Sequence, residues 1–341
     1  MKIALFYPHN LLAGWYAQGG YVNTLERMGH TVLNAWVPGN QPNNIEKWQK
    51  ERPTIEELST CDLVLSMYHE YMTPWYNEIY GFENWQKLRT TVVARFDESF
   101  DRPDLLLGRR WEEMRRWAQV FSFPAAQDAQ KYHGQWEPFG ADTTMFNAFG
   151  KEDLEISNFG LPVRKYDIGF IGSPYAIRKD YLARLGEHLP DELTFRWGQC
   201  LVQDIEGLRV QESTELMAKN YRELKIFFCL PPMSKLIVAK IPDILACGTF
   251  VMYPKLPWHA RENMCQFEDK KHLVYYDPGY ISQNAEQVKY YLEHEAEREQ
   301  IAKQGYQHVH ESYTLEKMLG RILDYALKQM GSAQAVEVGA T

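Results

Sequence analysis

The sequence predicts an α/β protein built from two consecutive parallel-sheet domains, and three observations support this fold class. The chain has 341 residues, more than the roughly 250 at which a single hydrophobic core usually stops growing. Short apolar runs alternate with helical stretches, which favours parallel strands covered by helices on both faces. A polar stretch at residues 147–165 interrupts this alternation, which then begins again.

Composition and charge fit an ordinary globular protein. Hydrophobic residues make up 45% of the chain and charged residues 24%, enough for two cores. The net charge of -8 disfavours capture of nucleic acid by overall charge, although a small anion can still occupy a local basic pocket. The chain opens without the pattern of a secretory signal and has no apolar run long enough to span a bilayer, which predicts a cytoplasmic protein.

The cysteines are five in number and widely scattered. A zinc site or a disulfide framework needs closer pairs, so reduced and buried thiols are expected. These cysteines are Cys61, Cys200, Cys229, Cys247 and Cys265.

The first domain is expected to cover residues 1–150, with an apolar strand at its start and a glycine-containing loop after it. Thr54 and Glu57 have the spacing of a capping box, which predicts a short helix after Thr54. Strands are expected at residues 2–7, 31–33, 62–67, 91–96 and 118–123, and a helix at residues 21–28.

The second domain is expected to cover residues 151–325 and to repeat this organisation, with 326–341 as the end of a helix and a tail. Asn284 is expected to cap a long helix that extends to residue 303. The other expected elements are strands at residues 166–171, 194–197, 224–229 and 248–253, and helices at residues 176–185 and 314–330.

Ligands of parallel-sheet folds gather outside the carboxyl ends of the strands. The first candidate site in such a position is Gly172 and Ser173, which lead into a helix with Arg178 in its first turns. A small loop lets backbone N–H groups approach the oxygens of a diphosphate, and a helix N-terminus favours negative charge. The alternative is a plain glycine turn beside a solvated arginine.

The segment 231–248 is the most informative part of the chain. It places Lys235, Lys240 and Asp243 before an apolar helix that Gly248 closes. Lysines bind phosphate as point charges, and a carboxylate accepts hydrogen bonds from both hydroxyls of a ribose. The alternative is a charged helix start, in which Asp243 serves only as a favourable anion.

The C-terminal half resembles the C-terminal domain of the CgeB-like, spore-maturation glycosyltransferases over most of residues 166–325. The N-terminal half resembles the motifs with which the family's first domain closes. The C-terminal similarity lies in residues 240–248, 270–276, 288–294, 298–305 and 310–314, and the N-terminal similarity in residues 96–97, 120–123, 132–134 and 137–142.

The resemblance implies a GT-B fold, in which two Rossmann-like domains face each other across a cleft. It implies a nucleoside diphosphate sugar bound by the second domain, with no required metal and no cofactor. Lys240 and Asp243 stand where such families usually carry an arginine and, three residues later, a glutamate. Lys235 stands where the broader retaining group has a second glutamate, so the sugar and the stereochemical outcome stay open.

Without a metal, cations must stabilise the departing nucleoside diphosphate, and Arg178, Lys235 and Lys240 are the candidates. An inverting enzyme also needs a base for the acceptor's proton. Asp97 and His69 follow expected strands of the first domain and are the candidate catalytic residues, with Glu98 and Glu70 beside them. The alternatives are polar loop residues and, for Asp97, a capping role.

Gly19 and Gly20 form a candidate loop for phosphate or acceptor, but they do not complete the dinucleotide-binding fingerprint, which disfavours a nicotinamide dehydrogenase. Aromatic residues gather in the first domain and suit either an acceptor groove or the core. They are Trp15, Tyr16, Tyr68, Tyr71, Trp75, Tyr76 and Tyr80.

The leading hypothesis is therefore transfer of a sugar from a sugar nucleotide to an acceptor, which is a glycan, a small molecule, a protein or a modified nucleobase. Two alternatives remain open. One is a nucleotide-sugar epimerase of the same fold, and the other is a non-catalytic module that binds nucleotides or glycans. The nucleotide, the sugar, the acceptor and the oligomeric state are left undetermined.

Overall fold

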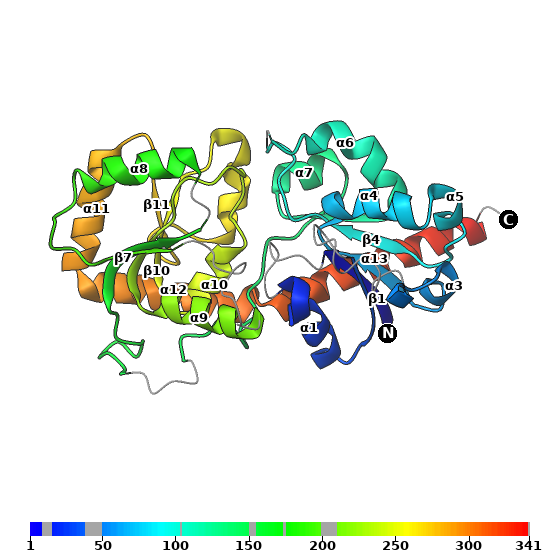
Figure 1. Ribbon diagram of the computed structural model, residues 1–341, viewed down its shortest axis with the longest axis horizontal. Coiled ribbons are helices and arrows are strands. Elements are labelled where there is room, and N and C mark those ends of the chain that lie inside the picture. Colours follow the sequence, from blue (N-terminus) through cyan, green and yellow to red (C-terminus); the bar gives the residue numbers. More distant parts are fainter. Residues whose placement is uncertain are drawn as a thin grey trace. The chain divides into compact units, whose positions relative to one another are not determined.

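The computed structural model (Figure 1) has two compact units, each with its own sheet. Unit 1 comprises Met1–Pro138, Ser234–Leu236 and Glu316–Thr341, and unit 2 comprises Phe139–Met233 and Ile237–Leu315. The structure describes residues 1–8, 16–37, 50–102, 104–149, 155–172, 175–198 and 210–339.

Unit 1 is built on a six-stranded parallel sheet with the strand order β2-β1-β3-β4-β5-β6. Its strands are apolar because helices cover both faces of a parallel sheet. They are β1 (Lys2–Pro8), β2 (Thr31–Val37), β3 (Leu63–Ser66), β4 (Val92–Arg95), β5 (Val120–Phe123) and β6 (Gln135–Trp136).

The helices of unit 1 are short, apart from the last. The predicted capping box is confirmed at α3, where Glu57 N–H donates to Thr54 Oγ1 (3.2 Å) and Thr54 N–H donates to Glu57 Oε2 (2.7 Å). The helical segments are η2 (Tyr16–Gly20), α1 (Tyr21–Arg27), α3 (Ile55–Leu58), α4 (His69–Ile79), α5 (Phe82–Trp85), α6 (Leu107–Met114), η4 (Arg115–Trp117), α7 (Ala126–Lys131) and α13 (Leu315–Gly339).

Aromatic rings form much of the core of unit 1. Tyr76 stacks on Trp85 with ring centroids 4.6 Å apart, and both residues are buried. Tyr80 packs against the same tryptophan. Core packing therefore explains Tyr76 and Tyr80, whereas Tyr71 is 41% exposed.

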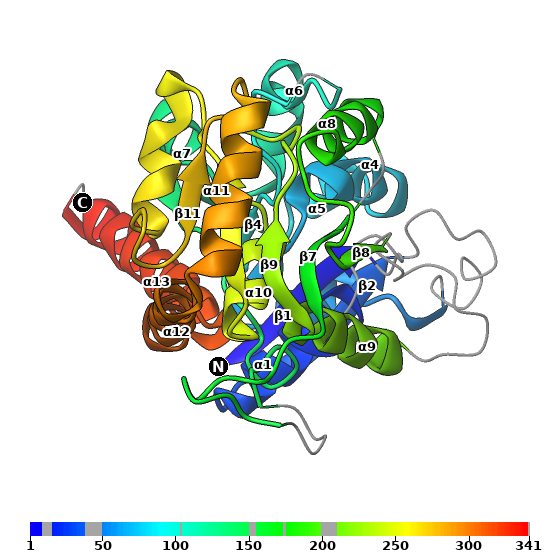
Figure 2. The same ribbon diagram turned by 90° about the vertical axis from the view of Figure 1, so that its left-hand side faces the viewer.

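Unit 2 is built on a five-stranded parallel sheet with the order β11-β10-β9-β7-β8. Figure 1 shows α8 and α11 on one face and α9, α10 and α12 on the other, and in Figure 2 α11 (orange) lies in front of the strands. The elements are β7 (Tyr166–Ile171), α8 (Ala176–Gly186), β8 (Phe195–Gly198), α9 (Val210–Arg222), β9 (Leu224–Phe228), α10 (Lys240–Ala246), β10 (Phe250–Pro254), η5 (Trp258–Gln266), β11 (Val274–Tyr276), α11 (Ile281–Glu293) and α12 (Glu295–Ser312).

The prediction that Asn284 caps a helix is wrong, because this residue lies inside α11. Its buried side-chain amide donates to Tyr181 Oη (2.7 Å) and to the Asp277 carbonyl oxygen (2.8 Å). The single helix expected up to residue 303 is instead two helices, α11 and α12, which meet at His294.

The division into units differs from the predicted boundary at residue 150. Unit 2 begins at Phe139 because its first residues pair with the end of the same unit. Ala141 N–H donates to the Tyr313 carbonyl oxygen (2.8 Å), and Leu315 N–H donates to the Ala141 carbonyl oxygen (2.7 Å). From Glu316 onward, α13 belongs to unit 1 and not to the second domain.

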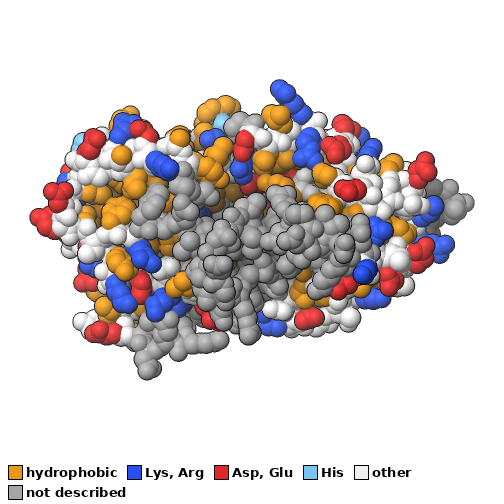
Figure 3. Space-filling model, viewed as in Figure 1, with side chains coloured by type: hydrophobic (Ala, Val, Ile, Leu, Met, Phe, Trp, Pro, Cys, Tyr) orange, Lys and Arg blue, Asp and Glu red, His pale blue; other side chains and the backbone are white. Residues whose placement is uncertain are grey.

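Surface charge, helix hydrophobicity and the burial of the cysteines can be compared with what the composition predicts. On the face drawn in Figure 3, acidic and basic side chains are interspersed. None of the described helices is both long and apolar enough to cross a bilayer. Cys61, Cys229 and Cys247 are free and buried as expected, whereas Cys265 is free and exposed, and Cys200 lies outside the described residues.

Candidate functional site

Two cations gather at the carboxyl edge of the unit 2 sheet. Arg178, in the first turn of α8, is buried and donates from Nε to the Pro231 carbonyl oxygen at 3.3 Å. Lys240, the first residue of α10, donates from Nζ to the Ile171 carbonyl oxygen at 2.9 Å. These contacts hold both side chains over the ends of β7 and β9.

Both cations also contact the ring of Phe170. Arg178 Cζ lies 5.2 Å from the ring centroid, and Lys240 Nζ lies 5.1 Å from it. A cation within about 6 Å of an aromatic face is attracted by the ring's quadrupole. The buried ring therefore orients two positive charges at the edge where ligands of parallel sheets bind.

Gly172 is required by the position of Lys240. A Cβ atom at this residue would lie 2.6 Å from Lys240 Nζ and 2.7 Å from Phe170 Cζ. No side chain fits without displacing the lysine or the ring. The predicted site residues Gly172, Arg178 and Lys240 thus come together, while Ser173 lies outside the described residues.

Asp243 lies inside α10, whereas Gly248 lies beyond its C-terminal end. Asp243 is three residues after Lys240 and 4% exposed, and residues at this spacing lie on the same side of a helix. Gly248 lies past the other end of α10, with a φ of 69° that suits a helix terminus. A Cβ there would lie 2.9 Å from Leu161 Cδ2, so a side chain at this helix end would also meet the core.

Lys235 is assigned to a different unit from Arg178 and Lys240. It belongs to the segment Ser234–Leu236, which groups with unit 1. The sequence interval between Lys235 and Lys240 suggested one cluster, but the contacts assign the two lysines to different units.

Asp97 follows β4 and lies in a buried network of unit 1. Its Oδ2 accepts a hydrogen bond from Tyr68 N–H at 2.9 Å, and its own N–H donates to Glu70 Oε1 at 3.1 Å. Tyr68 has a φ of 53°, in the left-handed region, where its N–H meets the carboxylate. The carboxyl ends of β3 and β4 are thereby joined through side chains.

Burial controls the ionisation of this network. Burial raises the pKa of Asp97 to about 6, against the opposing charge of Arg95, whose Nε lies 3.7 Å from Asp97 Oδ1. Burial, followed by the charge of Asp97, raises the pKa of Glu70 well above its usual value. Burial and the proximity of the two carboxyl groups therefore both disfavour two negative charges in this network.

The structure does not leave His69 available as a base. The residue is fully buried, its Nδ1 lies 2.9 Å from Ser66 Oγ, and its Nε2 lies 3.1 Å from the Met114 carbonyl oxygen. Burial lowers the pKa of His69 to about 4. Both nitrogens are occupied by protein groups, so His69 holds α4 in place. Glu98, the other neighbour of Asp97, forms an ion pair with Arg102.

The predicted glycine loop is helical at its end. Gly19 and Gly20 are the last residues of η2, which continues directly into α1, and Gly20 has helical dihedral angles (φ -55°, ψ -48°). The glycines therefore extend a helix toward its N-terminus, and they do not form an open turn.

Sequence reasoning missed Arg95 and Phe170. Arg95 is fully buried, and its Nη1 donates to Ser122 Oγ (3.3 Å) and to the Glu137 carbonyl oxygen. An arginine inside an apolar strand is a signal that was available in the sequence. Phe170 carried no such signal, because an aromatic residue in a buried strand looks like ordinary core.

Comparison with known proteins places these features in a known fold. Residues 190–324 match the family described as glycosyl transferase-like. HepE from Anabaena, in complex with UDP-glucose, is similar with a TM-score of 0.62 and 13% identity, over 96% of this chain and 100% of that chain. The fold is GT-B.

Other solved structures agree with the GT-B fold. Sucrose-phosphate synthase from Thermosynechococcus elongatus has a TM-score of 0.61 and 15% identity, with full coverage of both chains. An alpha-glucosyltransferase in complex with UDP and a mismatched 13-mer DNA has a TM-score of 0.63 and 12% identity, over 95% of this chain and 99% of that chain. No curated protein matches the sequence.

Proposed function

We propose that this GT-B protein is a CgeB-like glycosyltransferase that moves a sugar from a nucleoside diphosphate sugar to an acceptor without a metal. The observation that carries the proposal is the pair of cations, Arg178 and Lys240, oriented around Phe170 at the carboxyl edge of the unit 2 sheet. The match of residues 190–324 to a glycosyl transferase-like family supports it.

The two cations have a direct chemical use in this reaction. When the glycosidic bond to the donor breaks, negative charge develops on the departing diphosphate. Arg178 and Lys240 are already held by the backbone carbonyls of Pro231 and Ile171, so little reorganisation is needed when that charge appears. Positive side chains can take the part that a metal plays in other transferases.

Asp243 is assigned to the nucleoside. It shares the Lys240 side of α10, and a carboxylate can accept hydrogen bonds from both ribose hydroxyls. UDP-glucose is the first donor to test, because similar structures were solved with UDP-glucose or UDP. The acceptor is a glycan, a small molecule, a protein or a modified nucleobase.

Asp97 is assigned as the base in an inverting reaction. A general base works best when its pKa lies near the working pH, and burial brings that of Asp97 to about 6. Its carboxylate is oriented by Tyr68 N–H, so the side chain has a defined direction at the end of β4.

The test is incubation of the full chain with UDP-glucose, with and without EDTA, and without an acceptor. Slow release of UDP and glucose that EDTA does not affect supports a metal-independent transferase. Reversible conversion of the sugar would indicate an epimerase, and binding without turnover would indicate a non-catalytic module. Loss of hydrolysis on adding EDTA would overturn metal independence.

A further inference from the structure

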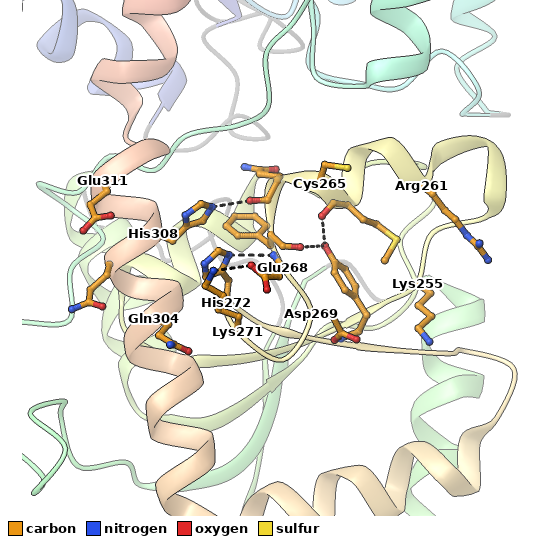
Figure 4. Close-up of a pocket in the computed structure, with 15 residues that line it drawn as sticks. Lys255, Arg261, Cys265, Glu268, Asp269, Lys271, His272, Gln304, His308 and Glu311 are labelled. Carbon is orange, nitrogen blue, oxygen red and sulfur yellow. Dashed lines mark hydrogen bonds and ion pairs between the residues drawn. The ribbon is translucent and has the colours of Figure 1, made fainter.

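Unit 2 contains a large cavity, lined by both polar and apolar groups, that the proposed donor site does not use. Its volume is about 940 Å³, within the range of small-molecule sites, and neither Arg178 nor Lys240 lines it. Figure 4 shows its walls, which come from η5, the turn before β11 and α12.

Two stacked histidines form one wall of the cavity. The rings of His272 and His308 have centroids 3.8 Å apart and an angle of 11° between their planes. His272 Nδ1 accepts a hydrogen bond from Glu268 N–H at 3.1 Å, so the neutral ring carries its hydrogen on Nε2. Burial, followed by the charges of His308 and Lys271, lowers the pKa of His272 to about 4, which keeps the ring neutral.

The Nε2–H group of His272 is available to a ligand. His272 is only 8% exposed, yet no group in the described part of the chain hydrogen-bonds to its Nε2. Since the residue lines the cavity, an oxygen of a bound ligand can accept this hydrogen bond.

Helix α12 adds uncharged and acidic groups beside the histidines. Gln304, Gln307 and Glu311 line the cavity at spacings of three and four residues, which places them on one side of the helix. Amides both donate and accept hydrogen bonds, and a carboxylate accepts them. This combination suits a ligand that carries several hydroxyl groups.

Two cations lie on the other side of the histidine pair. Figure 4 shows Lys255 and Arg261 there, with Gln304 and Glu311 on the opposite side. Among the described residues, neither Lys255 nor Arg261 has a side-chain hydrogen bond or ion pair. The acids nearby are engaged, since Glu268 pairs with Lys271 (2.8 Å) and Asp269 accepts from Tyr275 N–H (2.8 Å).

We propose that this cavity binds a small phosphorylated sugar. Its hydroxyl groups meet His272 and the α12 side chains, and its phosphate meets Lys255 and Arg261, which bind anions by charge-assisted hydrogen bonds. The site goes beyond the proposed transferase function, because it shares no residue with the donor site and its occupancy does not depend on turnover.

The experiment is calorimetric titration of the full chain with glucose 6-phosphate, and with glucose and inorganic phosphate separately. Glucose 6-phosphate should bind at least about tenfold more tightly than either part, because it engages both sides of the cavity. Arg261→Gln should weaken this binding by about tenfold or more. Arg184→Gln, at an exposed arginine of α8 outside the cavity, is the matched control and should leave affinity unchanged.

Three results would overturn the proposal: no binding of glucose 6-phosphate, unchanged affinity in Arg261→Gln, or equal loss in Arg184→Gln. Competition by UDP would assign the binding to the donor site instead. A separate titration with UDP-glucose keeps the two proposals apart, since the cavity can bind its ligand even if the donor assignment fails. Arg261 is exposed, so its replacement leaves the fold intact.

Discussion

Lys240 Nζ donates a hydrogen bond to the Ile171 carbonyl oxygen at 2.9 Å, which joins the start of α10 to the end of β7. The bond directs the ammonium group across Gly172, where a Cβ would lie only 2.6 Å from it. The absence of a side chain at Gly172 is therefore part of how Lys240 is positioned.

Gly172→Ala should weaken UDP binding by about tenfold, because the new methyl group displaces Lys240 and one charge-assisted contact to the diphosphate is lost. Calorimetry with UDP measures the effect. Gly186→Ala is the matched control, since a Cβ there meets nothing within 4 Å. Equal UDP affinity in the two variants would contradict the assignment of Lys240 to the diphosphate.

Asp243→Asn should weaken binding of UDP while leaving binding of inorganic pyrophosphate nearly unchanged. The amide keeps the size of the side chain but replaces one acceptor oxygen with a donor, so the ribose hydroxyls lose a partner. Asp180→Asn, at an exposed carboxylate of α8, controls for the general loss of a negative charge. A parallel loss for UDP and pyrophosphate would show that Asp243 acts on the phosphates and not on the ribose.

The rate of UDP-glucose hydrolysis should rise with pH through about 6 and level off above it, because Asp97 must be ionised to accept a proton. Asp97→Asn should remove this limb of the profile and lower the rate by about 10²–10⁴-fold. The control is Asp62→Asn, at an exposed residue before β3, which should keep the wild-type rate and the wild-type pH profile. A profile unchanged in Asp97→Asn would exclude Asp97 as the base.

Ionisation of Asp97 should lower the stability of the protein, whereas it should raise the rate of hydrolysis. The folded pKa of Asp97, about 6, lies above the ordinary value of 3.8, so the folded state binds the proton more tightly. Its contribution to the free energy of unfolding is greatest below about pH 4 and is lost as the pH rises through about 6. The free energy of unfolding of the wild type should therefore fall more between pH 4.5 and pH 7 than that of Asp97→Asn. Urea unfolding of both proteins at the two pH values measures the difference.

Arg321→Gln should destabilise unit 1 by about 2–3 kcal/mol, because it leaves the carboxylate of Glu137 buried without its main partner. Arg321 Nη2 lies 2.7 Å from Glu137 Oε1, and the Glu137 side chain is 2% exposed. Urea unfolding measures the loss, and adding Glu137→Gln should restore part of it. Arg27→Gln breaks the exposed pair with Glu316 and should cost less than about 1 kcal/mol.

The strands could be predicted because the signals are local. A parallel strand buried on both faces is a continuous apolar run, and the runs at β1 and β7 are recognisable without any knowledge of their neighbours. The capping box at Thr54 and the helix end at Gly248 are equally local, since each depends on a few adjacent residues.

The candidate site was predicted only in part because its geometry is not local. Arg178 and Lys240 were named from their positions after expected strands, but their shared contact with Phe170 depends on the packing of β7 between β8 and β9. His69 looked like a loop residue, yet the fold buries it against Ser66 and Met114.

By itself, the sequence determined two parallel-sheet units, the candidate cations Arg178 and Lys240, and the apolar helix that ends at Gly248. These signals are local, because apolar periodicity and charge can be read from neighbouring residues. The tertiary structure decided which of those charges meet, where α13 belongs and how Asp97 is ionised. Each of these depends on contacts between residues far apart in the chain. Burial and distance, which set the energy of a charge, exist only after the chain has folded.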